Sequence, residues 1–512
     1  MKKVFSIIGL SLTFLLIYLA LTLAFSTTWL QVTFADISMD KIFFHLLMPL
    51  EGTERQLIFS FVRECLVTPL IISVAFIFVL GYWCKKRIYL TASLKKRTKS
   101  LLIFPPVFLQ RKVVLAAIAL LCLTCSLLYI DKVFDIRTYY KYFTTETVIY
   151  KEHYINPRNT PIHFPEHPNN LILVFLESVE STFQDTEAGG AFGENLIPEL
   201  TQLARNNIHF SYSDKITGGE VISGWTMGAT VTATAGVPLK PPPTGFAKDG
   251  NSLDTMKFIL SRAHTLSDIL AANGYNITHV QGTPSRFAGL NKYLLGHGYQ
   301  KIIDPTSVSK TTNDYQLSDF GFFDKDIYEL SKQEITRLSK TGKPFAVSIN
   351  TMDTHFMDGV VCDKCGNSFK ELYQNVYACA SKQADEFVSW IKQQPFGQNT
   401  TIVLLGDHVT MNPDFFDRHT TIQDYHRVPY NVIINSRVQP YKDKNRKFSM
   451  LDWFPTIIES LGAEIDADGL ALGRSLFRDI YTLTERMGFD SLINELQKQS
   501  PLYNSLYFTV DF

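Results

Sequence analysis

The segment Asn170-Leu-Ile-Leu-Val-Phe-Leu-Glu177 decides the fold, because an unbroken apolar run ends abruptly in a carboxylate. A run this short, without polar alternation, is typical of a strand that is buried on both faces of a parallel sheet. In open α/β sheets, ligands bind beyond the carboxyl ends of such strands. Glu177 is therefore a candidate for a functional site at one edge of a sheet.

Two later segments repeat this pattern of an apolar run followed by polar side chains. The run 401–406 leads directly to Asp407 and His408, and the run 345–349 is followed shortly afterwards by His355. Carboxylates and imidazoles are residue types that bind metals or phosphates. Three such strand ends indicate one shared site, which is the layout of an enzyme.

Strand-like and helix-like stretches alternate from about Asn170 to the C-terminus. This alternation predicts an α/β domain with a mostly parallel sheet and helices on both faces. The predicted strands are 170–176, 207–212, 276–282, 344–350, 401–406 and 430–435, and the clearest helical patterns between them cover 369–392 and 452–461.

The first third of the chain is far more apolar than the rest. Uncharged apolar runs cover about residues 4–25, 65–83 and 113–130, and each is near the roughly 20 residues that a membrane-spanning helix needs. The first run follows Lys2 and Lys3, as a cleaved signal peptide would, but its length favours a span that is retained. The sequence thus predicts an N-terminal helical transmembrane region.

The loop between the second and third spans gives the orientation. It carries nine basic residues and no acidic one, and such loops stay in the cytoplasm. We therefore expect residues 26–64 and everything after Asp131 to lie outside the cytoplasm. The basic residues are Lys85, Lys86, Arg87, Lys95, Lys96, Arg97, Lys99, Arg111 and Lys112.

These patterns divide the chain into three parts. We predict a membrane region over 1–131, a connector over 132–169 and an extracytoplasmic catalytic domain over 170–512. Segment 38–60 is apolar in part but too short to cross a membrane, so it is either an interfacial helix or a linker packed against the spans. The chain has 49 basic and 49 acidic residues, and this balance argues against a nucleic-acid partner.

Three of the seven cysteines fall in the exported domain, where oxidation is expected. Cys362-Asp-Lys-Cys365 has half the spacing of a zinc site, but a second pair is missing. We favour a disulfide between one member of this pair and Cys379, which leaves one thiol over. A redox-active pair is less favoured, since no strand–helix pattern of the thioredoxin type surrounds it. The other cysteines, in or beside the spans, are Cys65, Cys84, Cys122 and Cys125.

A glycine-rich segment, 218–229, surrounds Thr226 and leads into the helix-compatible run 227–235. This pattern places Thr226 near a helix N-terminus, where free backbone N–H groups and the helix dipole attract an anion. One interpretation is that a phosphoryl group binds beside Thr226. The other is that Thr226 only caps the helix.

A threonine hydroxyl is a weak nucleophile unless a base or a metal activates it. Glu177, Asp407 and His408 supply two oxygens and one nitrogen. Together with Thr226 they form a set of four ligands that suits Zn²⁺ or Mn²⁺. A divalent cation would favour the ionised hydroxyl, as it does for bound water.

These residues and their surroundings resemble the alkaline phosphatase/sulfatase superfamily. The similarity covers about residues 170–480 and is greatest to the branch that contains lipoteichoic acid synthase and the phosphoglycerol transferase of osmoregulated periplasmic glucans. The motifs that carry it are Phe175-Leu-Glu177-Ser-Val-Glu-Ser-Thr, Gly224-Trp-Thr226-Met, Met352-Asp-Thr-His355 and Asp407-His408-Val-Thr-Met-Asn412.

The resemblance implies an alkaline-phosphatase-like sheet and a role for each matched residue. Thr226 would be the nucleophile that becomes glycerophosphorylated, and Glu177, Thr226, Asp407 and His408 would bind one divalent metal. Mn²⁺ is favoured as that metal, with Zn²⁺ or Mg²⁺ as alternatives. His355 would bind the phosphoglycerol group or the leaving alcohol. Weaker candidates for the substrate pocket are Trp225, Arg286 and His297.

By the same resemblance, we expect a multi-pass protein of the bacterial inner membrane that transfers phosphoglycerol from phosphatidylglycerol to an extracytoplasmic glycan. Polymerisation of glycerol phosphate, as in lipoteichoic acid synthesis, and transfer of phosphoethanolamine are alternatives within this class. An inactive membrane sensor or scaffold is an alternative from another class. The surroundings of Thr226 lack the Cys-x-Pro-x-Arg pattern of a sulfatase nucleophile.

Overall fold

The chain divides into a helical unit within residues 2–140 and an α/β unit within residues 141–512. Most of segment 38–60, for which the sequence left two interpretations, lies outside the described residues. The computed structural model describes residues 2–33, 55–83, 88–94, 97–104, 112–136, 140, 144–213, 218–240, 257–308, 315, 317–318, 321–355 and 358–507.

Three helices of the helical unit are long and apolar enough to cross a membrane, over Ser11–Thr33, Leu57–Val79 and Ala116–Phe134. Few of their side chains are buried inside the protein, as expected for helices whose surroundings are apolar. The helices pack side by side, and the Ser126 hydroxyl donates a 2.8 Å hydrogen bond to the carbonyl of Ala20. The elements are α1 (Lys2–Thr33), α3 (Arg55–Phe61), α4 (Thr68–Trp83) and α5 (Lys112–Phe134).

The second apolar helix begins earlier than the apolar run 65–83 predicted. A π-helical turn, Val62–Val67, joins α3 to α4, so the helix continues across Arg63 and Glu64. These two charged side chains form a 2.7 Å ion pair. They interrupt the hydropathy pattern, although the backbone stays helical through them.

A β-hairpin occupies the basic loop, where the sequence predicted no regular element. Strand β1 (Ile88–Leu94) pairs antiparallel with β2 (Arg97–Phe104). Both segments contain branched and aromatic residues that favour strands.

The α/β unit is built on a six-stranded sheet in the order β6-β5-β7-β4-β8-β9. The first five strands of that order are parallel, and β9 runs antiparallel to β8. The predicted α/β fold with a mostly parallel sheet is confirmed. The strands are β4 (Asn170–Leu176), β5 (Asn276–Gln281), β6 (Lys301–Ile303), β7 (Phe345–Asn350), β8 (Thr400–Gly406) and β9 (Asn431–Ile434).

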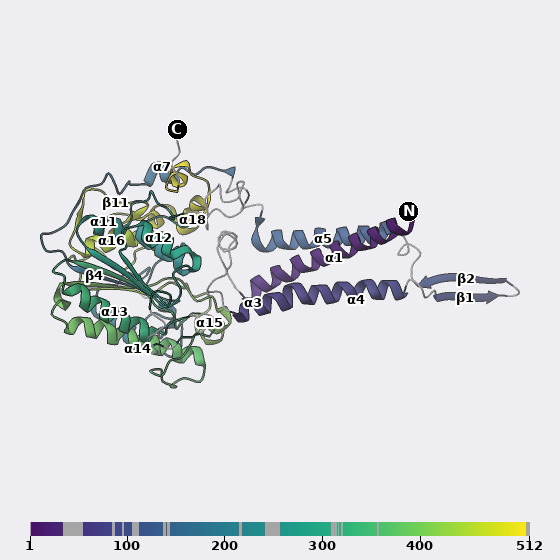
Figure 1. Cartoon of the computed structure of the whole chain (residues 1–512), viewed down its shortest axis with the longest axis horizontal. Coiled ribbons are helices and arrows are strands. Elements are labelled where there is room, and N and C mark those ends of the chain that lie inside the picture. The colour runs from purple at the N-terminus through teal and green to yellow at the C-terminus, as the bar shows by residue number, and fades with distance from the viewer. Residues whose placement is uncertain are drawn as a thin grey trace. The chain divides into compact units, whose positions relative to one another are not determined.

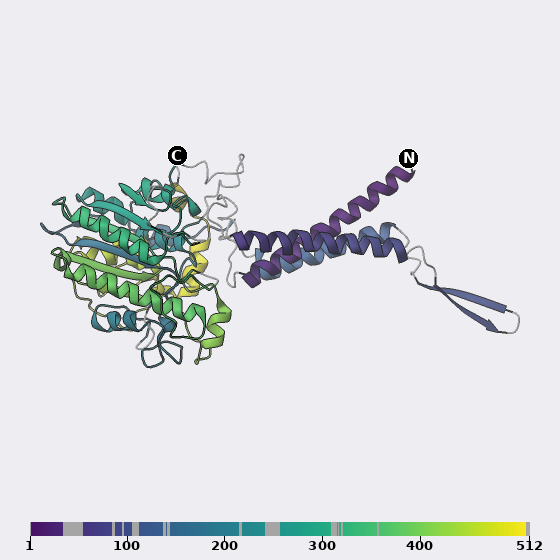
Figure 2. The same cartoon turned by 60° about the horizontal axis from the view of Figure 1, so that its bottom comes forward.

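Helices cover both faces of this sheet and enclose two apolar cores (Figures 1 and 2). Alternate residues of β4 point to opposite faces: Leu171 and Phe175 join one core, and Ile172 and Leu176 join the other. The first core is covered by α9 (Thr226–Ala235), α11 (Leu266–Ala272), α12 (Leu290–Gly296) and α16 (Trp453–Ser460), and the second by α8 (Pro198–Asn206), α13 (Asp324–Ser339) and α14 (Leu372–Gln393).

Two details of the sheet differ from the prediction. Segment 207–212 is not a strand, because it meets the sheet only through an isolated bridge between Ile208 and Ile433. Strand β6 was missed, since its three residues follow polar neighbours and form no apolar run.

Residues 144–169 of the predicted connector fold with the α/β unit, whereas its described residues 132–136 and 140 belong to the helical unit. Tyr150 is 1% exposed within the first core, and β3 (Ile162–His163) pairs with β10 (Glu464–Ile465). The other short elements are α7 (Ile149–His153), α15 (Pro413–His419), β11 (Gly469–Leu470), β12 (Gly473–Arg474), α17 (Leu483–Met487), α18 (Phe489–Gln497), α19 (Pro501–Ser505) and 3₁₀ turns at Ser181–Phe183, Phe287–Gly289, Gly397–Asn399 and Met450–Asp452.

Strand β4 lies between β7 and β8, and the three strands end at the same edge. In the register of the sheet, Phe175 is opposite Asn350, and Leu176 is opposite Gly406. The residues that follow these strands are therefore neighbours in space.

Candidate active site

Glu177, Asp407 and His408 form a buried group that we call the carboxylate–imidazole cluster. Their ligand atoms all lie within 4.8 Å of one another. His408 Nε2 is 3.4 Å from Glu177 Oε1 and 3.5 Å from Asp407 Oδ2. None of the three residues is more than 1% exposed. The structure thus brings together three of the four predicted metal ligands.

Two backbone features create this convergence. Ser178 adopts a left-handed conformation (φ 53°) directly after β4, which lets its N–H donate to Asp407 Oδ1 at 2.9 Å and its hydroxyl donate to Glu177 Oε1 at 2.8 Å. At Gly406, a Cβ atom would lie only 1.9 Å from the carbonyl oxygen of Val179. The close approach of the chains that follow β4 and β8 therefore requires glycine at this position.

Thr226 is the fourth member of the predicted set. It is the first residue of α9, and its hydroxyl donates a 2.9 Å hydrogen bond to Glu177 Oε2. The cap position is held by Trp225, whose backbone is extended, so the interpretation of Thr226 as a simple helix cap is wrong. The hydroxyl instead lies between the positive end of a helix and a buried carboxylate.

Burial and charge act in opposite directions on the two carboxylates of the cluster. Burial alone would raise the pKa of Glu177, but the neighbouring His408 and His355 and the hydroxyls of Ser178 and Thr226 outweigh it, so that this pKa is lowered. Burial, reinforced by the negative charge of Glu177, raises the pKa of Asp407 to about 7. Two buried carboxylates whose negative charges repel each other in this way are stabilised by a cation that binds both.

The donor set fits a divalent metal ion. Asp407 Oδ2 is buried without a hydrogen-bond partner, and an unsatisfied buried carboxylate oxygen is costly unless something binds it. His408 Nδ1 lies 2.9 Å from the carbonyl of Val409. Since a carbonyl only accepts, Nδ1 carries a proton, and Nε2 is the nitrogen that faces the carboxylates, as in metal-binding histidines.

Two side chains of the segment after β7 form hydrogen bonds with the backbone of Glu177. Thr351 Oγ1 accepts a 3.0 Å hydrogen bond from the N–H of Glu177, and the hydroxyl of Thr354 donates to the Glu177 carbonyl. The charge of His355 contributes to the lowered pKa of Glu177. His355 directly follows Thr354, which contacts Glu177, so the structure brings this residue beside the cluster.

Two buried carboxyls beside this segment were not singled out from the sequence. Both Asp353 oxygens are buried without hydrogen bonds, and burial, reinforced by Asp324, raises the Asp353 pKa to about 9. Asp324 accepts hydrogen bonds from the N–H groups of Met352 and Asp353. Asp353 lies inside the Met352-to-His355 motif, so the sequence offered an indication of it. Asp324 follows no apolar strand, and the sequence offered no indication of it.

The three weaker pocket candidates have different surroundings. His297 is 1% exposed, and its ring nitrogens contact Asp268 at 2.8 Å and the Ile259 carbonyl at 3.1 Å. Neither nitrogen is left for a substrate, so the structure argues against that role. Trp225 is 8% exposed and belongs to the first core. The side chain of Arg286 is exposed, and its role stays a prediction.

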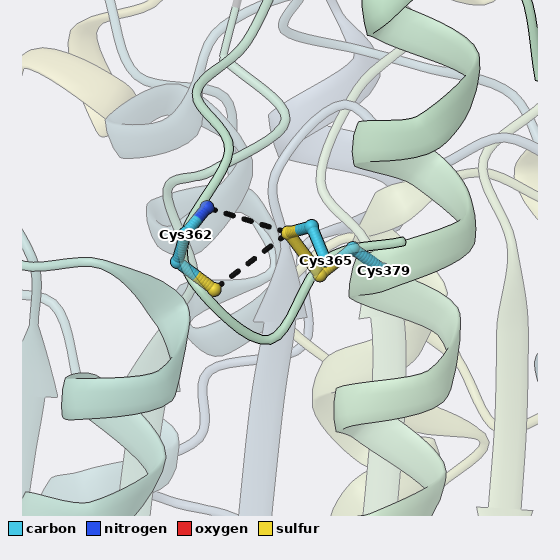
Figure 3. Close-up of side chains that lie close together, drawn as sticks. All are labelled: Cys362, Cys365 and Cys379. Atoms are coloured by element: carbon cyan, nitrogen blue, oxygen red, sulfur yellow. Dashed lines mark hydrogen bonds between the residues drawn. A yellow bond between two sulfur atoms is a disulfide. The ribbon is translucent and has the colours of Figure 1, made fainter. Parts of the chain in front are cut away.

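The three cysteines of the α/β unit, Cys362, Cys365 and Cys379, lie together (Figure 3). Cys365 forms a disulfide with Cys379 of α14, and Cys362 keeps a free thiol whose sulfur is 3.6 Å from that of Cys365. This is the pairing favoured from the sequence, with one thiol left over. Burial raises the pKa of the Cys362 thiol, which disfavours its reactive thiolate form.

Comparisons with known proteins bear on the fold and the family. The family model described as Sulfatase matches residues 169–463. Phosphoglycerol transferase I of Shigella flexneri is 27% identical over 330 residues, which cover 63% of this chain and 40% of that protein. The chain therefore spans less than half the length of this relative.

Two solved structures are similar to this chain. The integral membrane lipooligosaccharide phosphoethanolamine transferase A of Neisseria meningitidis superposes with a TM-score of 0.50 at 12% identity, over 88% of this chain and 84% of that one. The lipoteichoic acid synthase LtaP of Listeria monocytogenes gives a TM-score of 0.48 at 17% identity, over 64% and 80% of the two chains.

Proposed function

This chain belongs to the sulfatase family, and on that premise we propose that it is a membrane-anchored phosphotransferase. It moves glycerol phosphate from phosphatidylglycerol to an extracytoplasmic glycan through a covalent intermediate on Thr226. The name of the relative from Shigella flexneri supports phosphoglycerol as the transferred group.

One observation carries the proposal. The Thr226 hydroxyl, at the N-terminus of a ten-residue helix, donates to a carboxylate of the carboxylate–imidazole cluster. The unpaired N–H groups of the first turn of α9 suit the oxygens of a phosphodiester beside the hydroxyl. A nucleophile and a site for the group it attacks thus lie at the same place.

Glu177, Thr226, Asp407 and His408 would hold one divalent metal ion, with Mn²⁺ favoured and Zn²⁺ or Mg²⁺ as alternatives. Bound there, the ion would supply the positive charge that favours the ionised form of the Thr226 hydroxyl and stabilises charge on the phosphoryl oxygens. The buried unpartnered oxygen of Asp407 supports this assignment.

The reaction proceeds in two displacements at phosphorus. In the first, Thr226 Oγ1 forms a bond to phosphorus, the bond to the diacylglycerol oxygen breaks, and diacylglycerol leaves with the proton from the hydroxyl. In the second, the oxygen of a glycan hydroxyl forms a bond to the same phosphorus, the bond to Thr226 Oγ1 breaks, and Thr226 Oγ1 takes up the acceptor's proton. His355 would bind the phosphoglycerol group or the leaving alcohol and would hold the proton that moves in each step.

The membrane helices give a physical reason for a lipid donor. A lipid head group stays at the bilayer surface, so a catalytic domain tethered to the same membrane meets it at high local concentration. With the basic loop in the cytoplasm, the α/β unit lies on the extracytoplasmic side of the bacterial inner membrane.

Mass spectrometry of the full-length protein in detergent tests the covalent step. After incubation with phosphatidylglycerol and Mn²⁺, and without acceptor, we expect one glycerophosphoryl adduct on the peptide that contains Thr226. Diacylglycerol should be released in equal amount. An adduct on another residue, or diacylglycerol without any adduct, would contradict the nucleophile assignment.

A parallel incubation with phosphatidylethanolamine separates the alternatives of the same class. Adduct formation from phosphatidylglycerol alone supports phosphoglycerol transfer, whereas a phosphoethanolamine adduct would replace it. Product chains longer than one glycerol phosphate unit would indicate a polymerase. Metal binding without turnover of either lipid would indicate a scaffold.

A further inference from the structure

Glu180 is a fully buried carboxylate, three residues beyond Glu177, that the proposed chemistry does not use. It is 0% exposed. Its Oε1 accepts a 2.7 Å hydrogen bond from the N–H of Thr410, and its Oε2 accepts from the hydroxyl of Thr182 at 2.7 Å and from Arg427 Nε at 2.9 Å. Arg427 Nη2 also donates to Oε1.

A single peptide group connects Glu180 to His408. The N–H of the Val409–Thr410 peptide donates to Glu180, and the C=O of the same peptide accepts from His408 Nδ1 at 2.9 Å. A peptide group is planar, so the direction of its N–H sets the direction of its C=O. Glu180 therefore determines where the carbonyl that holds the His408 ring points.

Arg427 forms hydrogen bonds both to Glu180 and to the backbone of Thr410. It makes two hydrogen bonds to the Glu180 carboxylate, and its Nη2 also donates to the carbonyl of Thr410 at 3.0 Å. The guanidinium lies 4.8 Å from the centre of the Phe416 ring. A planar guanidinium bound in this way has little freedom to reorient.

We propose that Glu180, held by Arg427, is a positioning residue for the metal site. It fixes the tautomer and the direction of His408 through the Val409–Thr410 peptide, and it thereby raises the affinity of the carboxylate–imidazole cluster for a divalent cation. The inference rests on the proposed function of that cluster. Residues that orient metal-binding histidines typically contribute about 10- to 100-fold to metal affinity.

Metal titration of the full-length protein in detergent tests the inference. After removal of bound metal, wild type, Glu180→Gln and Arg427→Lys are titrated with Mn²⁺ and with Zn²⁺ by calorimetry. Glutamine has the shape of glutamate but replaces one acceptor oxygen by a donor, so it cannot serve all the donors. We expect its dissociation constant to rise about 10- to 100-fold, with a smaller rise for Arg427→Lys.

Arg446→Lys is the matched control. Arg446 is also buried, at 4% exposure, and donates to Glu485 at 2.8 Å and to the carbonyl of Ile480 at 2.8 Å. Its guanidinium donates to the segment 476–485 and not to the His408 loop. We expect its metal affinity to stay within about twofold of wild type, because distant sites act independently.

A second variant covers the case in which Glu180→Gln does not fold. Thr182→Val removes one donor to Glu180 and no charge, and we expect a severalfold weaker metal affinity with a native near-ultraviolet circular dichroism spectrum. In addition, excess Mn²⁺ should restore the turnover of each folded variant, since the defect lies in metal binding. A purely structural role would lower the unfolding temperature without this metal dependence.

Wild-type metal affinity in folded Glu180→Gln or Thr182→Val would overturn the proposal. The titration needs no lipid, so its result is independent of turnover. If wild type binds metal but transfers no phosphoglycerol, the proposed function fails while the titration still decides the role of Glu180.

Discussion

At the scale of single residues, the site is defined by charges that are buried close together. Glu177 and Asp407 share one imidazole and one hydrogen-bonding serine, yet their pKa values move in opposite directions. Below about pH 7, Asp407 of the metal-free protein holds a proton where a cation would otherwise bind. Protons and metal ions therefore compete for the same oxygen atoms.

We predict that metal affinity falls as the pH drops through about 7, the raised pKa of Asp407. The dissociation constant for Mn²⁺, measured between pH 5.5 and 8 in roughly half-unit steps, should decrease with pH and then level off. A pH-independent constant over this range would contradict the assignment of Asp407 as a ligand that titrates.

The same pKa predicts how stability depends on pH without metal. The folded pKa of Asp407, about 7, exceeds its ordinary value of 3.8, so the folded protein binds more protons between these values and loses stability as the pH rises through them. Asp407→Asn should show a shallower decline in unfolding temperature from pH 5 to 8. Some decline should remain, because burial also raises the pKa values of Asp353, Asp324 and Asp452.

Replacement of Thr226 by alanine should abolish transfer while the domain stays folded. The change removes one partly exposed hydroxyl, which donates to Glu177 Oε2. We expect a fall in turnover on the order of 10⁴-fold or more, as for nucleophiles of other hydrolases. Thr226→Ser is the control, since it keeps an attacking oxygen and should retain measurable turnover. Substantial activity in the alanine variant would exclude Thr226 as nucleophile.

The sequence revealed those site residues that follow apolar strands or glycine-flanked turns. Glu177 and Asp407 were visible because a buried run ends at each of them, and Thr226 because a helix begins there. Ser178 and Glu180 were not visible as site residues. They act through backbone geometry, a left-handed residue and a peptide shared with His408, and neither leaves a pattern in composition or spacing.

At the scale of elements, a disulfide joins the segment after β7 to α14. Cys365 and Cys379 are separated by 14 residues. The same region is held by the Tyr373 hydroxyl, which donates to the carbonyl of Thr354. Two kinds of link thus restrain the chain next to His355.

Cys379→Ser should lower the free energy of unfolding by about 3 kcal/mol, because the unfolded chain is no longer restricted by a closed loop of this length. Thermal unfolding of the full-length protein in detergent, with and without a reductant, provides the measurement. Cys362→Ser is the control and should unfold like wild type, since Cys362 is outside the disulfide. Equal stability of the two variants would contradict the pairing.

Elements that contain continuous apolar runs were predicted with nearly the observed bounds, as β4, β7 and β8 illustrate. The predicted elements were wrong where tertiary contacts outweighed the local sequence pattern. Segment 207–212 has strand-like composition, but it meets the sheet at one bridge. The helix around Arg63 continued through a charged pair, because its backbone hydrogen bonds do not depend on hydropathy.

At the scale of the whole molecule, a helical unit with three apolar helices precedes an α/β unit. The presence of these helices and the α/β class were predictable, because both follow from patterns that extend over long stretches of the sequence. The orientation across a membrane stays a prediction from the basic loop. Its test needs intact cells.

We predict that a protease added to spheroplasts digests the α/β unit but not an epitope inserted into the basic loop between Leu94 and Arg97. Permeabilised cells should lose the epitope as well. The reason is that nine basic residues hold this loop in the cytoplasm. Cleavage of the epitope in intact spheroplasts would reverse the orientation and place the disulfide in a reducing compartment.

The adjacency of β7, β4 and β8 has a consequence for how such proteins diversify. The carboxylate–imidazole cluster is fixed at the ends of β4 and β8, and Thr226 at the start of α9, whereas surface loops generally tolerate change. An ancestral enzyme could therefore acquire different loops, and with them a new acceptor, while its catalytic residues stayed in place. Chimeras that graft the loops of one relative onto the strands of another are the corresponding route for engineering.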